Sequence, residues 1–187
     1  VDAAALIEEK MAQTIIALAD NAARWRAVPT LGFTHYQPAQ PLTAGRRLAG
    51  WASDLHLTLR RLEHLPWLAR CRGFRGATGT QASFLALFAG HGEVVDRFEI
   101  SATVRFGSEA CLPQSVLDNN YTKTDKREVY FDLSGQTCPR VIDTFILADL
   151  ASCAAVLHKI ATDIRLLCNR KELDEPFEDK QIGSSAM

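Results

Sequence analysis

The chain has 187 residues, of which 47% are hydrophobic and 23% are charged, and its formal net charge is −1. This length suffices for one domain with its own hydrophobic core, and the composition is typical of a soluble globular protein. The near-neutral balance argues against a nucleic-acid partner. No uninterrupted apolar run approaches the roughly 20 residues that span a bilayer, so we expect no membrane partner either.

The cysteines are odd in number and show no close pair spacing. This pattern predicts neither a disulfide framework nor a zinc site, and we expect no metal and no cofactor. Reduced thiols fit a cytoplasmic protein, which is the location we expect. The five cysteines are Cys71, Cys111, Cys138, Cys153 and Cys168.

Two long helices are predicted in the first part of the chain. Apolar side chains recur at helical spacing over residues 2–26 and again over 42–68. Pro29 ends the first helix, because proline disfavours the helical conformation of the residue before it. Between the helices lies TLGFTHYQPAQP, residues 30–41, which we interpret as a polar connection stiffened by its prolines.

The middle of the chain is richer in glycine and polar residues. The segment RGFRGATGTQASF, residues 72–84, predicts a loop, with a helix beginning near Gln81. A further helix is expected over 93–105. Residues 106–125 have no sustained period and carry polar turn residues, so we predict a surface loop insertion there.

The last helix is the clearest element of the sequence. Apolar residues follow a three–four spacing from Val141 to about Arg170, some eight turns at about 3.6 residues a turn. Helices of this length usually belong to bundles, in which they bury one stripe against neighbours. Residues 128–133, EVYFDL, predict a short extended piece ahead of it.

His35 is a candidate for acid–base chemistry, since imidazole exchanges a proton near neutral pH. It lies between Thr34 and Tyr36 in the segment that Pro38 and Pro41 stiffen. From spacing alone, the alternative of a histidine that merely satisfies loop carbonyls stays open.

Three other segments are candidate ligand contacts, and each also has an ordinary structural interpretation. The glycines of RGFRGATGTQ permit close approach to a ligand or simply a turn, and the segment lacks the Gly-Lys-Ser/Thr of a P-loop. SGQT, residues 134–137, either presents the Gln136 amide or only begins the last helix. The serines of GSS, residues 183–185, act as a base only where the surroundings stabilise the alkoxide.

Taken in order, five segments resemble the adenylosuccinate lyase family of the fumarase/aspartase/argininosuccinate lyase superfamily. The resemblance covers nearly the whole chain. Other members of the superfamily share the Thr-His-x-Gln kernel but usually differ around it, so the longer matches are specific. The segments are TLGFTHYQPAQP, RGATGTQASF, SGQT, KIATDIRLL and EPFEDKQIGSSAM.

The resemblance implies an all-α fold, in which the central domain of the superfamily is a bundle of long helices. It also implies a homotetramer whose active sites are assembled from loops of three chains. The implied reaction is a general acid–base β-elimination that releases fumarate from adenylosuccinate, and from the succinylated aminoimidazole carboxamide ribotide, in purine biosynthesis.

The resemblance further implies roles for single residues. One acts as the general acid that protonates the departing nitrogen, one as the general base on a mobile loop, and three contact the substrate. Arg72 and Arg75 are candidate cations beside the substrate phosphate and carboxylates, or simply surface charges. The acid is His35, the base is Ser184, and the substrate contacts are Thr34, Gln136 and Ser185.

Residues 1–187 then correspond to the central helical-bundle portion of a longer lyase chain. The sequence begins at Val1 inside a helical pattern and stops at Met187, before the Pro-x-Lys-x-Asn that continues the family's signature. The lysine of that continuation helps to hold the substrate, so we expect this portion alone to be inactive. The insertion at 106–125 looks longer than the corresponding family segment.

Two alternatives remain beside this interpretation. One is another fumarate-releasing enzyme such as argininosuccinate lyase, which substrate competition would distinguish. The other is a non-catalytic helical scaffold that keeps the fold for assembly only. Four residues that match the family's site are present together, which argues against the scaffold. They are Thr34, His35, Gln136 and Ser184.

Overall fold

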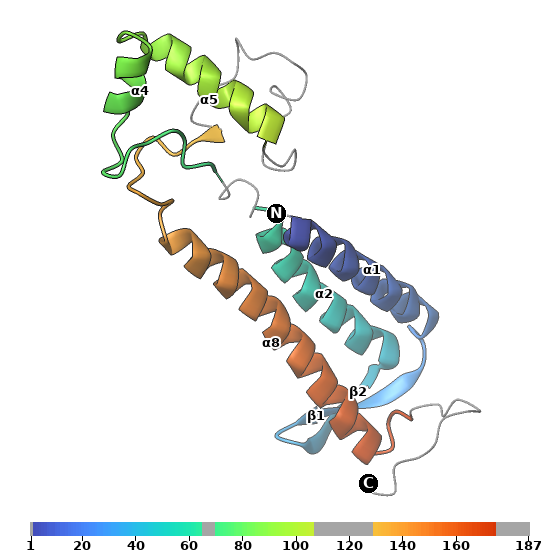
Figure 1. Cartoon of the computed structure of the whole chain (residues 1–187). Helices are drawn as coiled ribbons and strands as arrows, with labels where there is room; N and C mark the ends of the chain where they lie inside the picture. Colours follow the sequence, from blue (N-terminus) through green and yellow to red (C-terminus); the bar gives the residue numbers. More distant parts are fainter. Residues whose placement is uncertain (1, 65–69, 107–128, 175–187) are drawn as a thin grey trace, which may run out of the picture. The chain divides into compact units, whose positions relative to one another are not determined.

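The computed structural model of the chain describes residues 2–64, 70–106 and 129–174, and most of these residues are helical (Figure 1). The elements in chain order are α1 (Asp2–Arg24), β1 (Pro29–Thr34), β2 (Gln37–Thr43), α2 (Ala44–Leu62), α4 (Ala82–Leu87), α5 (Gly92–Phe106) and α8 (Val141–Asn169).

The chain divides into two compact units. One, here called the glycine-loop unit, comprises Val1–Gln13 and Leu57–Ser152, and the other, the hairpin unit, comprises Thr14–His56 and Cys153–Met187. Helices α1, α2 and α8 each contribute part of their length to both units.

The helix predictions are confirmed at most of their boundaries. The helices expected over 2–26, 93–105 and 141–170 are α1, α5 and α8, with ends within two residues of the prediction. The helix expected over 42–68 is α2, which the structure ends at Leu62. The helix expected near Gln81 is the single short turn of α4.

Two other predictions concern the insertion and the extended piece in the middle of the chain. Of the insertion predicted at 106–125, Phe106 still belongs to α5 and the rest lies outside the described residues. The extended piece predicted over 128–133 reduces to an isolated parallel bridge between Tyr130 and Cys71.

The polar connection expected at 30–41 joins α1 and α2, but its strand structure was not predicted: β1 and β2 form an antiparallel hairpin there. The pairing runs from Pro29 opposite Thr43 to Thr34 opposite Gln37, with an irregularity between Leu31 and Phe33. Both strands of a two-stranded sheet are edge strands, which tolerate prolines that cannot donate to the ladder. The described part of the chain is therefore mostly helical, and this hairpin departs from the expected all-α structure.

Each unit has buried side chains of its own. In the hairpin unit, Trp51, Leu55, Cys153 and Leu167 are buried. A Cβ on Gly45 would overlap the backbone of Ala22 and Arg26, so the start of α2 requires a glycine where it meets the end of α1. In the glycine-loop unit the buried residues include Leu62, Val95, Glu99, Ile100, Val129 and Tyr130.

Helix α8 carries many apolar side chains that the described residues leave exposed. Phe145 is 44% exposed, Leu147 is 65% exposed and Leu157 is 48% exposed. By length and composition alone this helix would suffice to cross a bilayer, although core helices of soluble proteins also meet that test. Contiguous exposed apolar surface is typical of interaction sites, whereas single exposed apolar residues are normal.

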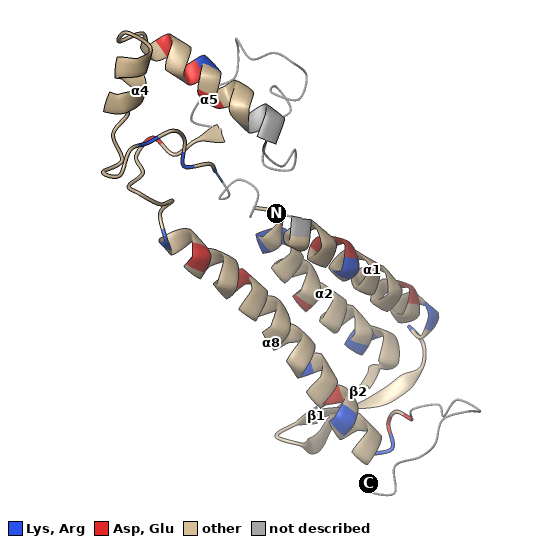
Figure 2. Ribbon diagram, viewed as in Figure 1, with Lys and Arg blue, Asp and Glu red and all other residues tan. Residues whose placement is uncertain are grey.

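Charged side chains are interspersed along the helices. Figure 2 shows both acidic and basic residues along each of α1, α2 and α8. This distribution agrees with the near-neutral composition of the chain.

Candidate functional site

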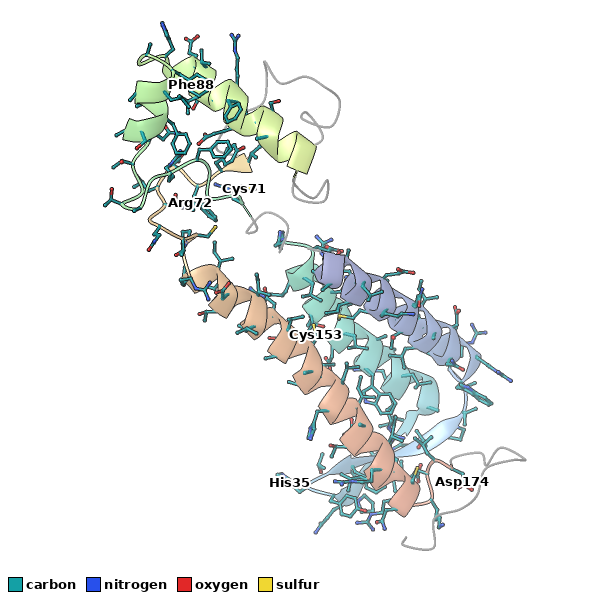
Figure 3. All side chains as sticks on the ribbon, in the orientation of Figure 1. His35, Cys71, Arg72, Phe88, Cys153 and Asp174 are labelled. Atoms are coloured by element: carbon teal, nitrogen blue, oxygen red, sulfur yellow. The ribbon has the colours of Figure 1, made fainter. Side chains whose placement is uncertain are left out.

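The turn of the hairpin consists of His35 and Tyr36, which have positive φ values of 50° and 60°. Positive φ at both central residues matches the right-handed twist of paired strands, but it is uncommon for residues other than glycine, asparagine and aspartate. Thr34 closes the ladder just before the turn, and the side chains of Thr34 and His35 are exposed. Figure 3 shows His35 at the tip of the hairpin.

The end of α8 holds the turn in this conformation. The Tyr36 hydroxyl donates to Oδ1 of Asn169, and Nη2 of Arg170 donates to the Tyr36 carbonyl oxygen at 2.7 Å. The Arg170 guanidinium also lies 3.9 Å from the centre of the Tyr36 ring and 5.7 Å from that of Phe33. These contacts offset the backbone strain of the turn.

A second set of contacts holds the start of β1. Glu172 accepts hydrogen bonds from the Thr30 hydroxyl and, at 3.2 Å, from the Leu31 amide. Arg47 donates from Nη1 to the Thr30 hydroxyl at 3.2 Å and from Nη2 to the Leu31 carbonyl oxygen at 2.7 Å. The Thr30 hydroxyl, the Leu31 amide and the Arg47 charge hold the pKa of Glu172 below its ordinary value, while burial opposes them.

A groove of about 650 Å³ lies beside the hairpin within the same unit, lined by residues of the hairpin, α2 and α8. On its wall, Asp163 Oδ2 accepts from the Trp51 indole at 3.0 Å and pairs with Lys159 Nζ at 2.7 Å. His35 is not among the residues that line this groove. Thr34 lines a second hollow, formed by β1 and β2 alone.

In the glycine-loop unit, a buried carboxylate organises the segment 72–81. Oε1 of Glu99 accepts hydrogen bonds from the Phe74 amide at 2.6 Å, from Arg75 Nη1 at 2.9 Å and from Gln81 Nε2 at 3.0 Å. The Glu99 side chain is fully buried and that of Arg75 is 7% exposed. Arg75 is therefore an interior ion-pair partner, which differs from both sequence interpretations of it.

Arg72 joins this loop to the segment SGQT. Its Nε donates to the Gly135 carbonyl oxygen at 3.0 Å, and its Nη2 donates to the carbonyl oxygens of Arg75 at 2.6 Å and Gly76 at 2.9 Å. The Ser134 hydroxyl donates back to the Arg72 carbonyl oxygen at 3.1 Å. Figure 3 shows Arg72 in this loop region, next to Cys71.

Gly79 allows the two segments to approach closely. Its φ is +83°, and a Cβ at this position would overlap the Ser134 carbonyl oxygen. Only glycine meets both conditions without strain. The glycines stand out in the sequence but their partner does not, because nothing in the spacing relates residues 72–80 to 134–137.

The structure brings some of the predicted site residues together and not others. Thr34 and His35 adjoin at the hairpin turn, whereas Gln136 lies in the glycine-loop unit with an exposed side chain. Ser184 and Ser185 lie outside the described residues. Among the residues that are described, no group of three or more metal-ligating side chains occurs.

Sequence comparisons relate the chain to known enzymes. A family profile described as lyase matches residues 1–187. Adenylosuccinate lyase of Saccharomyces cerevisiae is 42% identical over 186 residues, which are 100% of this chain and 35% of that protein. The same enzyme of Schizosaccharomyces pombe is 45% identical over 183 residues, and that of Archaeoglobus fulgidus is 34% identical over 190 residues.

In each case the match covers nearly all of this chain but only about a third of the relative. The Schizosaccharomyces pombe match covers 97% of this chain and 34% of the relative, and the Archaeoglobus fulgidus match covers 100% and 36%. The chain thus spans about a third of the length of the curated relatives it matches.

Proposed function

The chain belongs to the lyase family, and from this premise we propose that it is the central helical-bundle portion of an adenylosuccinate lyase. The proposed enzyme eliminates fumarate from adenylosuccinate to give AMP, and from the succinylated aminoimidazole carboxamide ribotide in the same way. Relatives of that name align with nearly the whole chain, which supports this choice over argininosuccinate lyase.

The observation that carries the proposal is the presentation of His35. An exposed imidazole stands at the tip of a hairpin whose turn is held by Asn169 and Arg170. A proton donor needs this combination of a fixed backbone and an accessible side chain, because general acid catalysis depends on geometry first and on pKa second.

In the proposed elimination, Ser184 removes a proton from the carbon beside a substrate carboxylate. The electrons of that C–H bond form the new double bond of fumarate, the C–N bond breaks, and its electron pair leaves on nitrogen. His35 then gives its proton to that nitrogen, which leaves as the amino group of AMP. Thr34, Gln136 and Ser185 contact the substrate and hold it for these transfers.

The proposal includes assembly and location. We propose a homotetramer in which loops of three subunits complete each active site, because His35 stands exposed at the tip of its hairpin and does not line the groove beside it. Exposed apolar residues of α8, such as Phe145 and Leu147, fit coverage by neighbouring helices. Reduced thiols such as the buried Cys153 fit the cytoplasm as the location.

The test is fumarate release by the full-length polypeptide that contains these residues, offered adenylosuccinate and argininosuccinate in parallel. We expect turnover of adenylosuccinate alone. His35→Ala should lower kcat by roughly 10²–10⁴-fold, the usual contribution of a general acid.

His158→Ala is the matched control, because His158 is an exposed histidine of α8 in the same unit. We expect this variant to retain the kcat of the unmodified enzyme. Unchanged turnover in His35→Ala would refute the assignment of the acid, and turnover of neither substrate would refute the function.

A further inference from the structure

Arg72 gives the segment SGQT a fixed position relative to the glycine-rich loop. Its guanidinium donates to carbonyl oxygens on both sides, to Gly135 from Nε and to Arg75 and Gly76 from Nη2. Because the guanidinium is planar and its donors point in fixed directions, these bonds set both the separation and the orientation of the two backbones. The Ser134 hydroxyl closes the connection by donating to the Arg72 carbonyl oxygen.

The loop to which Arg72 is tied is itself rigidly held. Buried Glu99 accepts from the Phe74 amide and from Arg75, so the backbone that follows Gly73 is fixed from the interior. The Tyr130 hydroxyl donates to the Glu99 carbonyl oxygen at 2.5 Å and thereby fixes α5 as well. Because the glycine-rich loop is held in this way, the bonds from Arg72 can fix the position of the SGQT backbone, which bonds from a mobile loop could not do.

Gln136 directly follows Gly135, so these contacts also fix where Gln136 lies. Its side chain is exposed, so the backbone that precedes it fixes the position of its Cα atom and the direction of its Cα–Cβ bond. That backbone has two supports here, the Arg72 guanidinium at Gly135 and the close packing of Gly79 against Ser134. The Nε and Nη2 groups of Arg72 are committed to these carbonyls, which argues against phosphate binding as their main role.

We propose that Arg72 is a positioning residue for Gln136, holding the Ser134–Gly135 backbone against the glycine-rich loop so that the Gln136 amide is oriented toward the substrate. This inference rests on the proposed function, since Gln136 is there a substrate contact. Arg72 acts through Gln136 and does not itself touch the reacting atoms.

The test is a double-mutant cycle in the full-length enzyme, with kcat and KM for adenylosuccinate measured for Arg72→Lys, Gln136→Ala and the combined variant. Lysine keeps the charge but cannot reach several carbonyls from a planar group. We expect Arg72→Lys to raise KM by about tenfold, the scale of one lost hydrogen bond. The combined variant should equal Gln136→Ala alone, because the two residues act in series.

Two further variants complete the design. Arg60→Lys is the matched control and should leave KM unchanged, since Arg60 is an exposed arginine of the same unit that pairs with Glu63, three residues further along the chain. Ser134→Ala removes one hydrogen bond without touching a charge, and should raise KM by about two- to fivefold. If Arg72→Lys fails to fold, Ser134→Ala still tests the inference. An unchanged KM in Ser134→Ala would then overturn it.

The outcomes separate this inference from the function on which it rests. Additive effects of Arg72→Lys and Gln136→Ala, or an unchanged KM in Arg72→Lys, would overturn the positioning role while leaving the lyase activity in place. An unchanged KM in Gln136→Ala would overturn it as well. If the unmodified enzyme releases no fumarate, the proposed function fails and this inference fails with it.

Discussion

The hairpin and the glycine-rich loop are both candidate site segments, but different kinds of contact hold them in place. The hairpin is held from outside, by the partly exposed side chains of Arg170 and Glu172 near the end of α8. The glycine-rich loop is held from inside, by the fully buried carboxylate of Glu99. Loss of an interior support should therefore cost more stability than loss of a surface one.

The largest effect is expected for Glu99→Ala. The substitution removes the carboxylate and leaves Arg75, only 7% exposed, as an uncompensated buried charge. Breaking a buried pair from one side typically costs about 3–5 kcal/mol. Urea denaturation of the full-length protein would measure this loss. Glu93→Ala, at an exposed position of the same helix, is the control and should change the midpoint little.

A smaller effect is expected for Gly79→Ala, which addresses the contact between the loop and SGQT. Alanine at φ +83° is strained, and its Cβ would overlap the Ser134 carbonyl oxygen. Gly90→Ala is a close match, because Gly90 has φ +84° and nothing within 4 Å of the added Cβ. Backbone strain costs on the order of 1–3 kcal/mol in both variants. Only Gly79→Ala should show an additional loss, and equal losses would contradict the proposed close packing.

The smallest effect is expected at Glu172, which tests the outer support of the hairpin through pH. Its folded-state pKa is lowered, chiefly by the Thr30 hydroxyl, so its contribution to stability is complete above the unfolded pKa of about 4.3. That contribution is lost as the pH falls through the lowered folded-state pKa. Comparing denaturation midpoints of the unmodified protein and Glu172→Gln should show a gap at neutral pH that closes in acid. A constant gap would contradict the assigned ionisation.

Sequence periodicity predicted the long helices because their apolar spacing is sustained over many turns, as in α8. It missed the hairpin, since His35 and Tyr36 lack the Asn-Gly signature of a two-residue turn and the prolines were interpreted as stiffening a polar connection. The positive φ values there depend on Arg170, which lies 134 residues away. No local pattern encodes such a partner.

The candidate site was predictable only where motif and local structure coincide. Thr34 and His35 are adjacent in sequence, so their proximity required no fold. The pairings of Arg72 with Gly135 and of Arg75 with Glu99 join residues far apart in the chain. The sequence alone presented the two arginines as candidate cations beside the substrate or as surface charges. Burial distinguishes an interior support from a surface charge, and sequence composition does not record it.

The contacts of the hairpin also bear on the order in which the chain folds. The strands pair locally, which an isolated hairpin does in about 1–10 μs. The Thr30–Glu172 hydrogen bond joins residues 142 positions apart, and the Tyr36–Asn169 bond spans 133. Contacts of such long range form late, because the intervening loop must close first. On the ribosome, the turn that carries His35 would thus emerge early but gain these supports only after residues 169–172 have been synthesised.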